Sequence, residues 1–178
     1  MQQPLWVFGY GSLMWDPCFA AMESQVARLA GWQRRFCMWS VHYRGTPSAP
    51  GLVLALDLAP DDHCDGIAFR VAAGQEQMVL DTLRERELIS YAYREEQLDV
   101  TLRDGRQVGA VAYVINRDHE QYADGLTLDD QAELIARRHG TKGPNRDYLW
   151  NTVVHLKTLG ICDGDLDWLA QRVRELTR

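Results

Sequence analysis

The sequence predicts an α+β domain in which a small closed or strongly curved sheet is accompanied by helices. The chain has 178 residues, the length of a single domain with a substantial core. Its first two thirds contain the short apolar runs typical of strands, and its last third has the periodicity and capping signals of helices. We therefore expect residues 1–178 to form one domain.

The β-rich part is expected to contain strands joined by turns. The expected strands are residues 5–8, 25–29, 34–39, 52–57, 65–71, about 97–102, and 108–115. Gly31 is expected to join the second strand to the third, and the polar residues after Asp57 are expected to form the turn of a hairpin. Asp104-Gly105 is the strongest hairpin signal in the sequence and connects the last two strands.

Four helices are expected. Their residues are 75–87, 127–139, about 145–159, and about 165–176. The first helix places Met78, Val79 and Leu83 on one side. A Thr-x-Asp-Asp cap begins the second helix and a loop at 140–143 follows it, after which Asn145 fits a capping position.

Charge and composition exclude several classes of function. The net charge of −6, without a Lys/Arg cluster, argues against binding to nucleic acid or to an anionic membrane surface. The four cysteines have no C-x-x-C spacing, and the histidines have no metal-ligand spacing. We expect buried thiols in a reducing compartment, no signal peptide in the first four residues, no membrane-spanning stretch, and a cytoplasmic protein.

The run Val7-Phe8-Gly9-Tyr10-Gly11-Ser12-Leu13 is a strand that ends in a two-glycine turn. Gly9 and Gly11 can take positive φ, and the exposed N–H groups of such a turn form a concavity for an anion or a carbonyl. An ordinary tight turn is the alternative. The run is neither a dinucleotide fingerprint nor a nucleophile elbow, because the required further glycines are missing.

Glu87 is the candidate for acid–base chemistry. At about 100° per residue it falls near Leu80 and Leu83 on the apolar side of its helix, whereas Glu85 falls near Met78 at the opposite edge. A carboxylate against apolar surface has a raised pKa, which suits a proton shuttle. Spacing alone also permits a solvated helix end with ion pairs to neighbouring arginines, which is the more common arrangement.

Two further polar segments offer candidate binding residues. Arg44, in the loop His42-Tyr43-Arg44-Gly45-Thr46-Pro47, can clamp a substrate carboxylate or can lie in an ordinary turn. Tyr148 lies one turn into the helix that follows Gly143-Pro144, and can equally belong to the core.

These signals occur in an order that resembles the ChaC-like γ-glutamylcyclotransferases, from residue 5 to about 155. The segments that carry the resemblance are Val7 to Trp15, Gly31-Trp32-Gln33-Arg34-Arg35-Phe36, Tyr43-Arg44-Gly45 with Pro50-Gly51, Gly66-Ile67-Ala68-Phe69, Arg86-Glu87 followed by Tyr93, and Gly143 to Leu149.

The resemblance implies a small mixed β-barrel with flanking helices. It also implies release of 5-oxoproline from a γ-glutamyl compound, typically glutathione, with no metal or organic cofactor. Glu87 would be the catalytic carboxylate, and Tyr148 would lie near the site. The γ-glutamyl group would be held by Tyr10, Gly11, Ser12 and Leu13.

The substrate's own α-amine can close the five-membered ring, so the protein needs no nucleophile and must supply geometry and a base. The alternatives are the same reaction on another γ-glutamyl amine or amino acid, and a non-catalytic module that binds a γ-glutamyl or carboxylate ligand. Where the family usually carries glycine shortly after Arg-Glu, this chain has Ser90-Tyr91-Ala92. We expect the bulk of Tyr91 to narrow the pocket or move the next strand and so to affect the choice of substrate. A monomer is compatible with the sequence.

Overall fold

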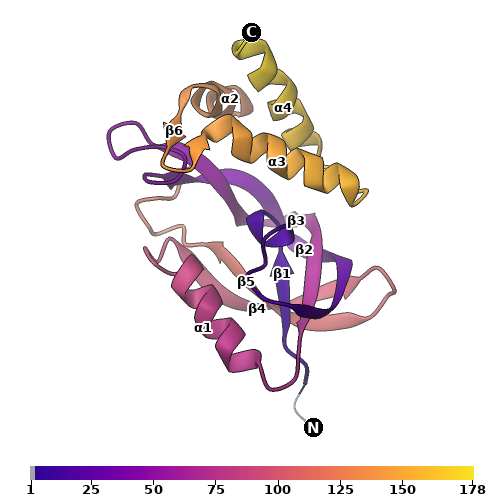
Figure 1. Ribbon diagram of the computed structural model, residues 1–178. Helices are drawn as coiled ribbons and strands as arrows, with labels where there is room; N and C mark the ends of the chain where they lie inside the picture. Colours follow the sequence, from indigo (N-terminus) through magenta and orange to yellow (C-terminus); the bar gives the residue numbers. More distant parts are fainter. Residues whose placement is uncertain (1–2) are drawn as a thin grey trace. The chain divides into compact units, whose positions relative to one another are not determined.

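A computed structural model of the protein describes residues 3–178 (Figure 1). The expectation that the first four residues do not belong to a signal peptide includes Met1 and Gln2. These two residues lie outside the described part of the chain. The chain divides into two compact units. The first unit comprises the chain up to Arg35 together with Ala55–His119, and the second comprises Phe36–Leu54 with Glu120–Arg178. Strands β2 (Ala21–Ser40) and β3 (Gly51–Val71) contribute residues to both units.

The sheet is a closed barrel with the strand order β1-β3-β2-β4-β5. The three shorter strands are β1 (Trp6–Gly9), β4 (Tyr93–Leu102) and β5 (Gln107–Ile115). Strand β1 runs antiparallel to β3 and parallel to β5, and β4 and β5 form the antiparallel hairpin expected around Asp104-Gly105. The barrel and the helices confirm the expected α+β fold with a small mixed barrel.

At two places the sequence predicts two strands where the structure has one continuous strand. Residues 25–29 and 34–39 belong to one strand, β2, which continues through Gly31 at φ +84°. Residues 52–57 and 65–71 also belong to one strand, β3, so the expected hairpin does not exist. The polar residues between them are mostly exposed. An exposed stretch of strand carries the same polar composition as a turn, which explains the error.

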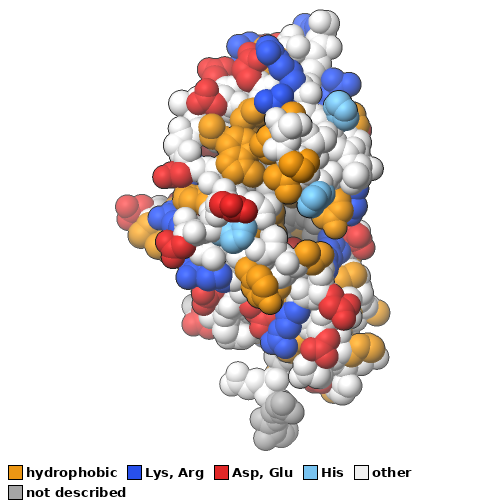
Figure 2. All heavy atoms as spheres, turned by 90° about the vertical axis from the view of Figure 1, so that its left-hand side faces the viewer, with side chains coloured by type: hydrophobic (Ala, Val, Ile, Leu, Met, Phe, Trp, Pro, Cys, Tyr) orange, Lys and Arg blue, Asp and Glu red, His pale blue; other side chains and the backbone are white. Residues whose placement is uncertain are grey.

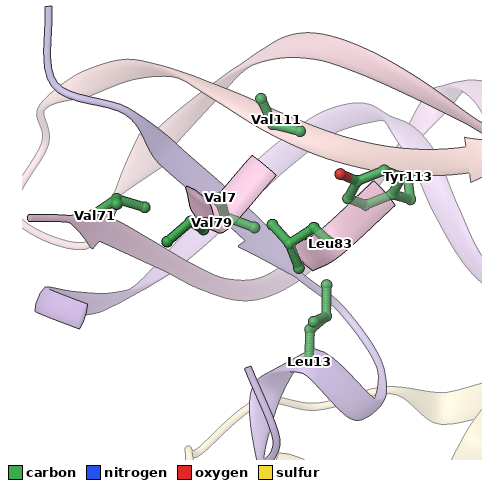
Figure 3. Close-up of a cluster of buried hydrophobic side chains, with 7 residues drawn as sticks. All are labelled: Val7, Leu13, Val71, Val79, Leu83, Val111 and Tyr113. Atoms are coloured by element: carbon green, nitrogen blue, oxygen red, sulfur yellow. The ribbon is translucent and has the colours of Figure 1, made fainter. Parts of the chain in front are cut away.

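The core of the first unit joins the barrel to helix α1 (Glu76–Glu87). Val79 and Leu83 of α1 pack in one cluster with strand residues and with Leu13, whose side chain is directed toward Leu83 (Figure 3). The remaining members of the cluster are Val7, Val71, Val111 and Tyr113. Met78, which was expected on the same side, is 60% exposed. The apolar face of α1 is therefore narrower than the sequence pattern indicates.

The second unit contains helices α2 (Leu128–Arg137), α3 (Asn145–Thr158) and α4 (Gly164–Leu176). Helix α2 begins with the expected cap: Thr127 Oγ1 accepts from the Asp130 N–H, and the Asp130 carboxylate accepts from the Thr127 N–H. This is a capping box, in which two otherwise unpaired helix N–H groups are satisfied. Helix α4 packs against both α2 and α3.

The segment expected to be the loop 140–143 is instead a tight hairpin. Strands β6 (His139–Gly140) and β7 (Gly143–Pro144) pair within it, and Gly143 turns the chain at φ +99°. A Cβ atom on Gly140 would lie 2.6 Å from the Gly45 nitrogen. The glycines of this segment therefore allow its backbone to approach the loop that contains Arg44.

The surface charge, the burial of the cysteines and the length of the helices test three expectations from the sequence. Acidic and basic side chains are interspersed over the face shown in Figure 2. All four cysteines are free, but only Cys37 and Cys64 are buried, so the expectation of buried thiols is wrong for Cys18 and Cys162. The latter two lie in loops, which run over protein surfaces. Among residues 3–178, none of the helices is both long and apolar enough to span a membrane.

Candidate active site

The glycine loop follows strand β1 and closes in a short 3-10 helix, η1 (Ser12–Met14). The expectation of positive φ at Gly9 and Gly11 is wrong: Gly9 is extended within β1, and Gly11 has φ −134°. The need for glycine at position 9 is steric, because a Cβ atom there would lie 3.1 Å from the Leu13 Cβ. A Cβ on Gly66 of β3 would collide with the Gly9 carbonyl oxygen. Close approach of backbone explains both glycines.

Buried hydrogen bonds hold the loop against the barrel. The Tyr10 hydroxyl donates to the carbonyl oxygen of Tyr113 on β5 at 2.8 Å. The Arg34 side chain donates from Nε to the Tyr10 carbonyl oxygen at 2.7 Å and from Nη2 to the Asp65 carbonyl oxygen. Arg34 belongs to the Gly31–Phe36 motif, but its sequence context alone indicates no role for it. Its buried guanidinium links the loop, at Tyr10, to strand β3, at Asp65.

The backbone N–H groups of Ser12 and Leu13 begin η1. The turn uses the N–H groups that follow: Met14 donates to the Gly11 carbonyl at 2.9 Å, and Asp16 donates to the Ser12 carbonyl at 2.9 Å. The first N–H groups of any such turn have no acceptor within it. The loop can therefore direct the N–H groups of Ser12 and Leu13 at a ligand oxygen.

Glu87 is the last residue of α1, and its side chain is only 15% exposed. Leu83, one turn earlier, is fully buried, whereas Glu85 is exposed on the same side of α1 as Met78. The helical spacing thus predicts which of the two carboxylates is sheltered. Glu87 also forms an ion pair, because its Oε1 lies 3.3 Å from Nε of Arg86. Shelter from water disfavours the charged carboxylate, and the guanidinium favours it.

Arg86 connects Glu87 to the glycine loop. Its Nη2 donates to Ser12 Oγ at 3.0 Å, and its Nη1 donates to the Asp16 carbonyl oxygen at 2.7 Å. The same guanidinium pairs with Glu87. Together with the packing of Leu13 against Leu83, these contacts bring the end of α1 to the loop. Among the predicted site residues, the structure brings Ser12, Leu13 and Glu87 together in this way.

The phenol of Tyr113 on β5 interacts electrostatically with Glu87. Burial, and after it the carboxylates of Glu95 and Glu87, raise the pKa of Tyr113 far above its usual range. The phenol therefore stays protonated and donates to Glu95 Oε2 at 3.1 Å. Arg84 of α1 donates to both carboxylate oxygens of Glu95, at 2.9 and 2.8 Å. Arg84 and Glu95 thus hold α1 against β4.

In the second unit, Arg44 and Tyr148 contact each other. The Arg44 guanidinium carbon lies 5.8 Å from the centre of the Tyr148 ring, and its Nη1 donates to the carbonyl oxygens of Lys142 at 2.8 Å and Pro144 at 3.1 Å. Burial lowers the pKa of Arg44 below its usual range. The Tyr148 hydroxyl accepts from the Leu54 N–H at 3.4 Å. These contacts give Arg44 a structural role, and its contact with a substrate carboxylate stays a prediction.

Asn145 does not cap α3, contrary to the expectation from sequence. Pro144 is the N-cap residue, and the side chain of Asn145 instead pairs with the backbone of Leu52 on β3. Its Oδ1 accepts from the Leu52 N–H at 2.8 Å, and its Nδ2 donates to the Leu52 carbonyl oxygen at 2.7 Å. Asn145 thereby fixes the start of α3, and with it Tyr148, against β3.

Tyr91 lies in the turn after α1. Its φ is +56°, in the left-handed region that glycine adopts without cost, and its side chain is 72% exposed. The backbone conformation explains why glycine suits this segment. The expected effect of Tyr91 on the pocket stays a prediction. Residues 3–178 contain no group of three or more His, Cys, Asp or Glu side chains that could hold a metal ion.

The comparison with known proteins decides the family. A family model described as "ChaC-like protein" matches residues 5–176. The chain belongs to the ChaC-like family. This ChaC-like chain is 35% identical to the glutathione-specific gamma-glutamylcyclotransferase of Escherichia coli, over 97% of the chain and 74% of that protein. It is 32% identical to gamma-glutamylcyclotransferase 2-3 of Arabidopsis thaliana, over 97% of the chain and 89% of that protein.

A solved structure agrees with the assignment of this chain to the ChaC-like family. The crystal structure of the yeast gamma-glutamyl cyclotransferase specific to glutathione superposes with a TM-score of 0.89, at 25% identity, over 99% of this chain and 98% of that one. The family and the fold expected from the sequence are thus confirmed for this ChaC-like protein. The roles of its individual residues stay predictions.

Proposed function

We propose that this protein is a γ-glutamylcyclotransferase that converts glutathione into 5-oxoproline and cysteinylglycine, with Glu87 as the general acid and base. The names of its relatives support the reaction and the substrate. The observation that carries the catalytic assignment is the guanidinium of Arg86, which joins the sheltered Glu87 to Ser12 of the glycine loop. A base and a loop suited to a carbonyl oxygen thus belong to one local structure.

The reaction needs a base before any bond can form. The α-amino group of a γ-glutamyl compound has a reference pKa of about 7.7–8.0, so near neutral pH it is largely protonated and not nucleophilic. Glu87 accepts one proton from this ammonium group. The amine nitrogen then attacks the γ-carbonyl carbon, and the five-membered ring closes in a tetrahedral intermediate. No nucleophile from the protein takes part.

Collapse of the intermediate breaks the bond between the γ-carbon and the amide nitrogen of the leaving group. Glu87, now protonated, supplies the proton that the departing nitrogen needs. It then takes the second proton from the ring nitrogen and passes it to the freed amine, which leaves as an ammonium group, and so returns to its starting state. The products are 5-oxoproline and, from glutathione, cysteinylglycine. A positioned acid–base residue of this kind contributes about 10²- to 10⁴-fold to a rate.

The glycine loop would hold the γ-glutamyl group through Tyr10, Gly11, Ser12 and Leu13. The N–H groups that begin η1 would donate hydrogen bonds to the γ-carbonyl oxygen and so stabilise the negative charge that develops on it. One such donor is worth about 3 kcal/mol in related chemistry. The buried contacts of Tyr10 with Tyr113 and Arg34 keep these donors in place before the substrate binds, which is what such stabilisation requires.

Arg44 and Tyr148 are proposed as further substrate-binding residues. Nη1 of Arg44 already donates to two carbonyl oxygens, so a substrate carboxylate would be bound by its other N–H groups. Loss of such binding would raise KM more than it lowers kcat. A cytoplasmic location is part of the proposal, because four free cysteines suit a reducing compartment.

Incubation of the purified protein with glutathione tests this function. We expect equal amounts of 5-oxoproline and cysteinylglycine, and much slower turnover of other γ-glutamyl amino acids. Turnover of another γ-glutamyl compound in preference to glutathione would support the first alternative. Binding of γ-glutamyl compounds without any 5-oxoproline from a panel of them would refute the enzyme and favour a binding module.

A further inference from the structure

The guanidinium of Arg86 contacts both the glycine loop and the proposed base. One guanidinium reaches three points: Ser12 Oγ at 3.0 Å, the Asp16 carbonyl oxygen at 2.7 Å, and Glu87 Oε1 at 3.3 Å. Its Nη1 also lies 3.6 Å from the Asp16 carboxylate. Ser12 begins η1, and Asp16 follows it. The guanidinium therefore contacts the loop at the first residue of η1 and again after η1 ends, as well as the proposed base.

A simple tether between a helix and a neighbouring element would not need this arrangement. Arg84, on the same helix, is such a tether: it pairs in a bidentate way with Glu95 on β4 and contacts neither the loop nor Glu87 in any described interaction. Arg86 is 28% exposed, less than Arg84 at 41%. The planar fork of arginine, with five N–H donors in fixed directions, allows one side chain to hold several acceptors at set angles.

We propose that Arg86 is the positioning residue of the active site, which holds the Glu87 carboxylate in register with the glycine loop and keeps it in the charged form that accepts a proton. This inference rests on the proposed function of Glu87. Arg86 itself moves no proton and acts through Glu87 and Ser12.

Two physical effects follow from the position of the guanidinium. The first is orientation, because the same rigid group fixes both Ser12 and Glu87, and small misplacements of catalytic groups reduce rates strongly. The second is charge. An opposite charge within about 4–6 Å of a carboxylate favours its ionised form. Among the described groups, Tyr113 on β5 interacts electrostatically with Glu87, and its hydroxyl contacts Glu95 on β4, which pairs with Arg84 of α1. Asp16 in the loop lies near the Arg86 guanidinium.

Substitutions of Arg86 separate these two effects. Arg86→Lys keeps the positive charge but loses the fork, so we expect kcat to fall about 10-fold while the acidic limb of the pH dependence of kcat/KM stays where it is in the wild type. Arg86→Gln loses both, so we expect a fall of about 10- to 100-fold, with the acidic limb moved to higher pH by about one unit. The limb moves upward because a carboxylate without its cation takes up a proton at higher pH.

Arg84→Lys is the matched control for Arg86→Lys. It loses a guanidinium fork on the same helix but keeps the positive charge beside Glu95, so its kcat and its acidic limb should remain within about twofold and about 0.3 pH units of the wild type. Thermal denaturation of all the variants shows how much stability each has lost.

The outcomes separate the inference from the proposed function. Wild-type protein without activity on any γ-glutamyl compound would overturn the proposed function. An active wild type that is impaired by Glu87→Gln but not by either Arg86 variant would overturn the role of Arg86 alone. Arg86 variants that lose only thermal stability, with the kcat and the acidic limb of the wild type, would show a structural tether and overturn the inference. If Arg86→Gln fails to fold, the kcat and pH profile of Arg86→Lys decide.

Discussion

Asn145 allows a stringent test of how the second unit holds Tyr148. Its side chain and Leu52 are both fully buried, and they share two hydrogen bonds of 2.7 and 2.8 Å. Asn145→Asp replaces the Nδ2 donor by an oxygen without a change of shape. The new carboxylate can still accept from the Leu52 N–H. Its other oxygen would face the Leu52 carbonyl oxygen, where a donor is required.

The expected loss follows from these contacts. A buried carbonyl without a donor costs about 1–3 kcal/mol, and a buried charge adds a comparable amount or more. We therefore expect Asn145→Asp to lower the free energy of unfolding by about 3–5 kcal/mol near neutral pH, a large part of the 5–15 kcal/mol typical of a domain. When protonated, the carboxyl group can donate to the Leu52 carbonyl oxygen, so its folded-state pKa is raised and the loss becomes smaller as the pH falls below that value.

Urea denaturation at pH 7.5 and at pH 5 measures both effects. Asn151→Asp, an exposed substitution on the same helix α3, is the matched control for the change in charge. The reasoning would be refuted if the two variants had free energies of unfolding within about 0.5 kcal/mol of each other at pH 7.5. It would also be refuted if the deficit of Asn145→Asp did not shrink at pH 5.

Two more stability predictions concern the first unit. Tyr91→Gly should leave the free energy of unfolding within about 0.5 kcal/mol of the wild type, because relief of the left-handed conformation offsets the greater freedom of the unfolded chain, whereas Tyr91→Val should cost at least about 1 kcal/mol more. Chemical denaturation that finds the two variants equal would contradict the positive φ at this position. The hydrogen bonds from Arg84 lower the pKa of Glu95 below its usual 4.5. The stability difference between wild type and Arg84→Gln should therefore be full near neutral pH and decline as the pH falls through the lowered pKa, which parallel urea titrations at pH 7 and pH 3 would show; a difference independent of pH would contradict it.

Much of the fold could be predicted because its signals are local. Thr127 and Asp130 form their capping box within four residues, and Gly105 takes the φ of +92° that the Asp104-Gly105 turn requires. The predictions of strand ends were wrong where the same polar composition is compatible with a turn and with an exposed strand. The polar residues after Asp57 suit a turn, but they form the exposed part of a long strand.

The site could be predicted only in part, because its contacts join residues far apart in the chain. Helical spacing favoured Glu87 over Glu85 as the sheltered carboxylate, and the structure shows Glu87 to be the less exposed of the two. The contact of Arg86 with Ser12, however, spans 74 residues, and the bond of Arg34 to Tyr10 spans 24. No local pattern reports such pairs. Only the order of the motifs, read as a family resemblance, connected the loop to the end of α1.

In the proposed reaction, Glu87 carries the proton while the substrate closes on itself. The most direct measurement is the rate of 5-oxoproline formation at saturating glutathione by Glu87→Gln, beside Glu85→Gln as an exposed control on the same helix. We predict that kcat falls at least about 100-fold for Glu87→Gln and stays near the wild-type value for Glu85→Gln, with both proteins folded by circular dichroism. Wild-type turnover by folded Glu87→Gln would contradict the account.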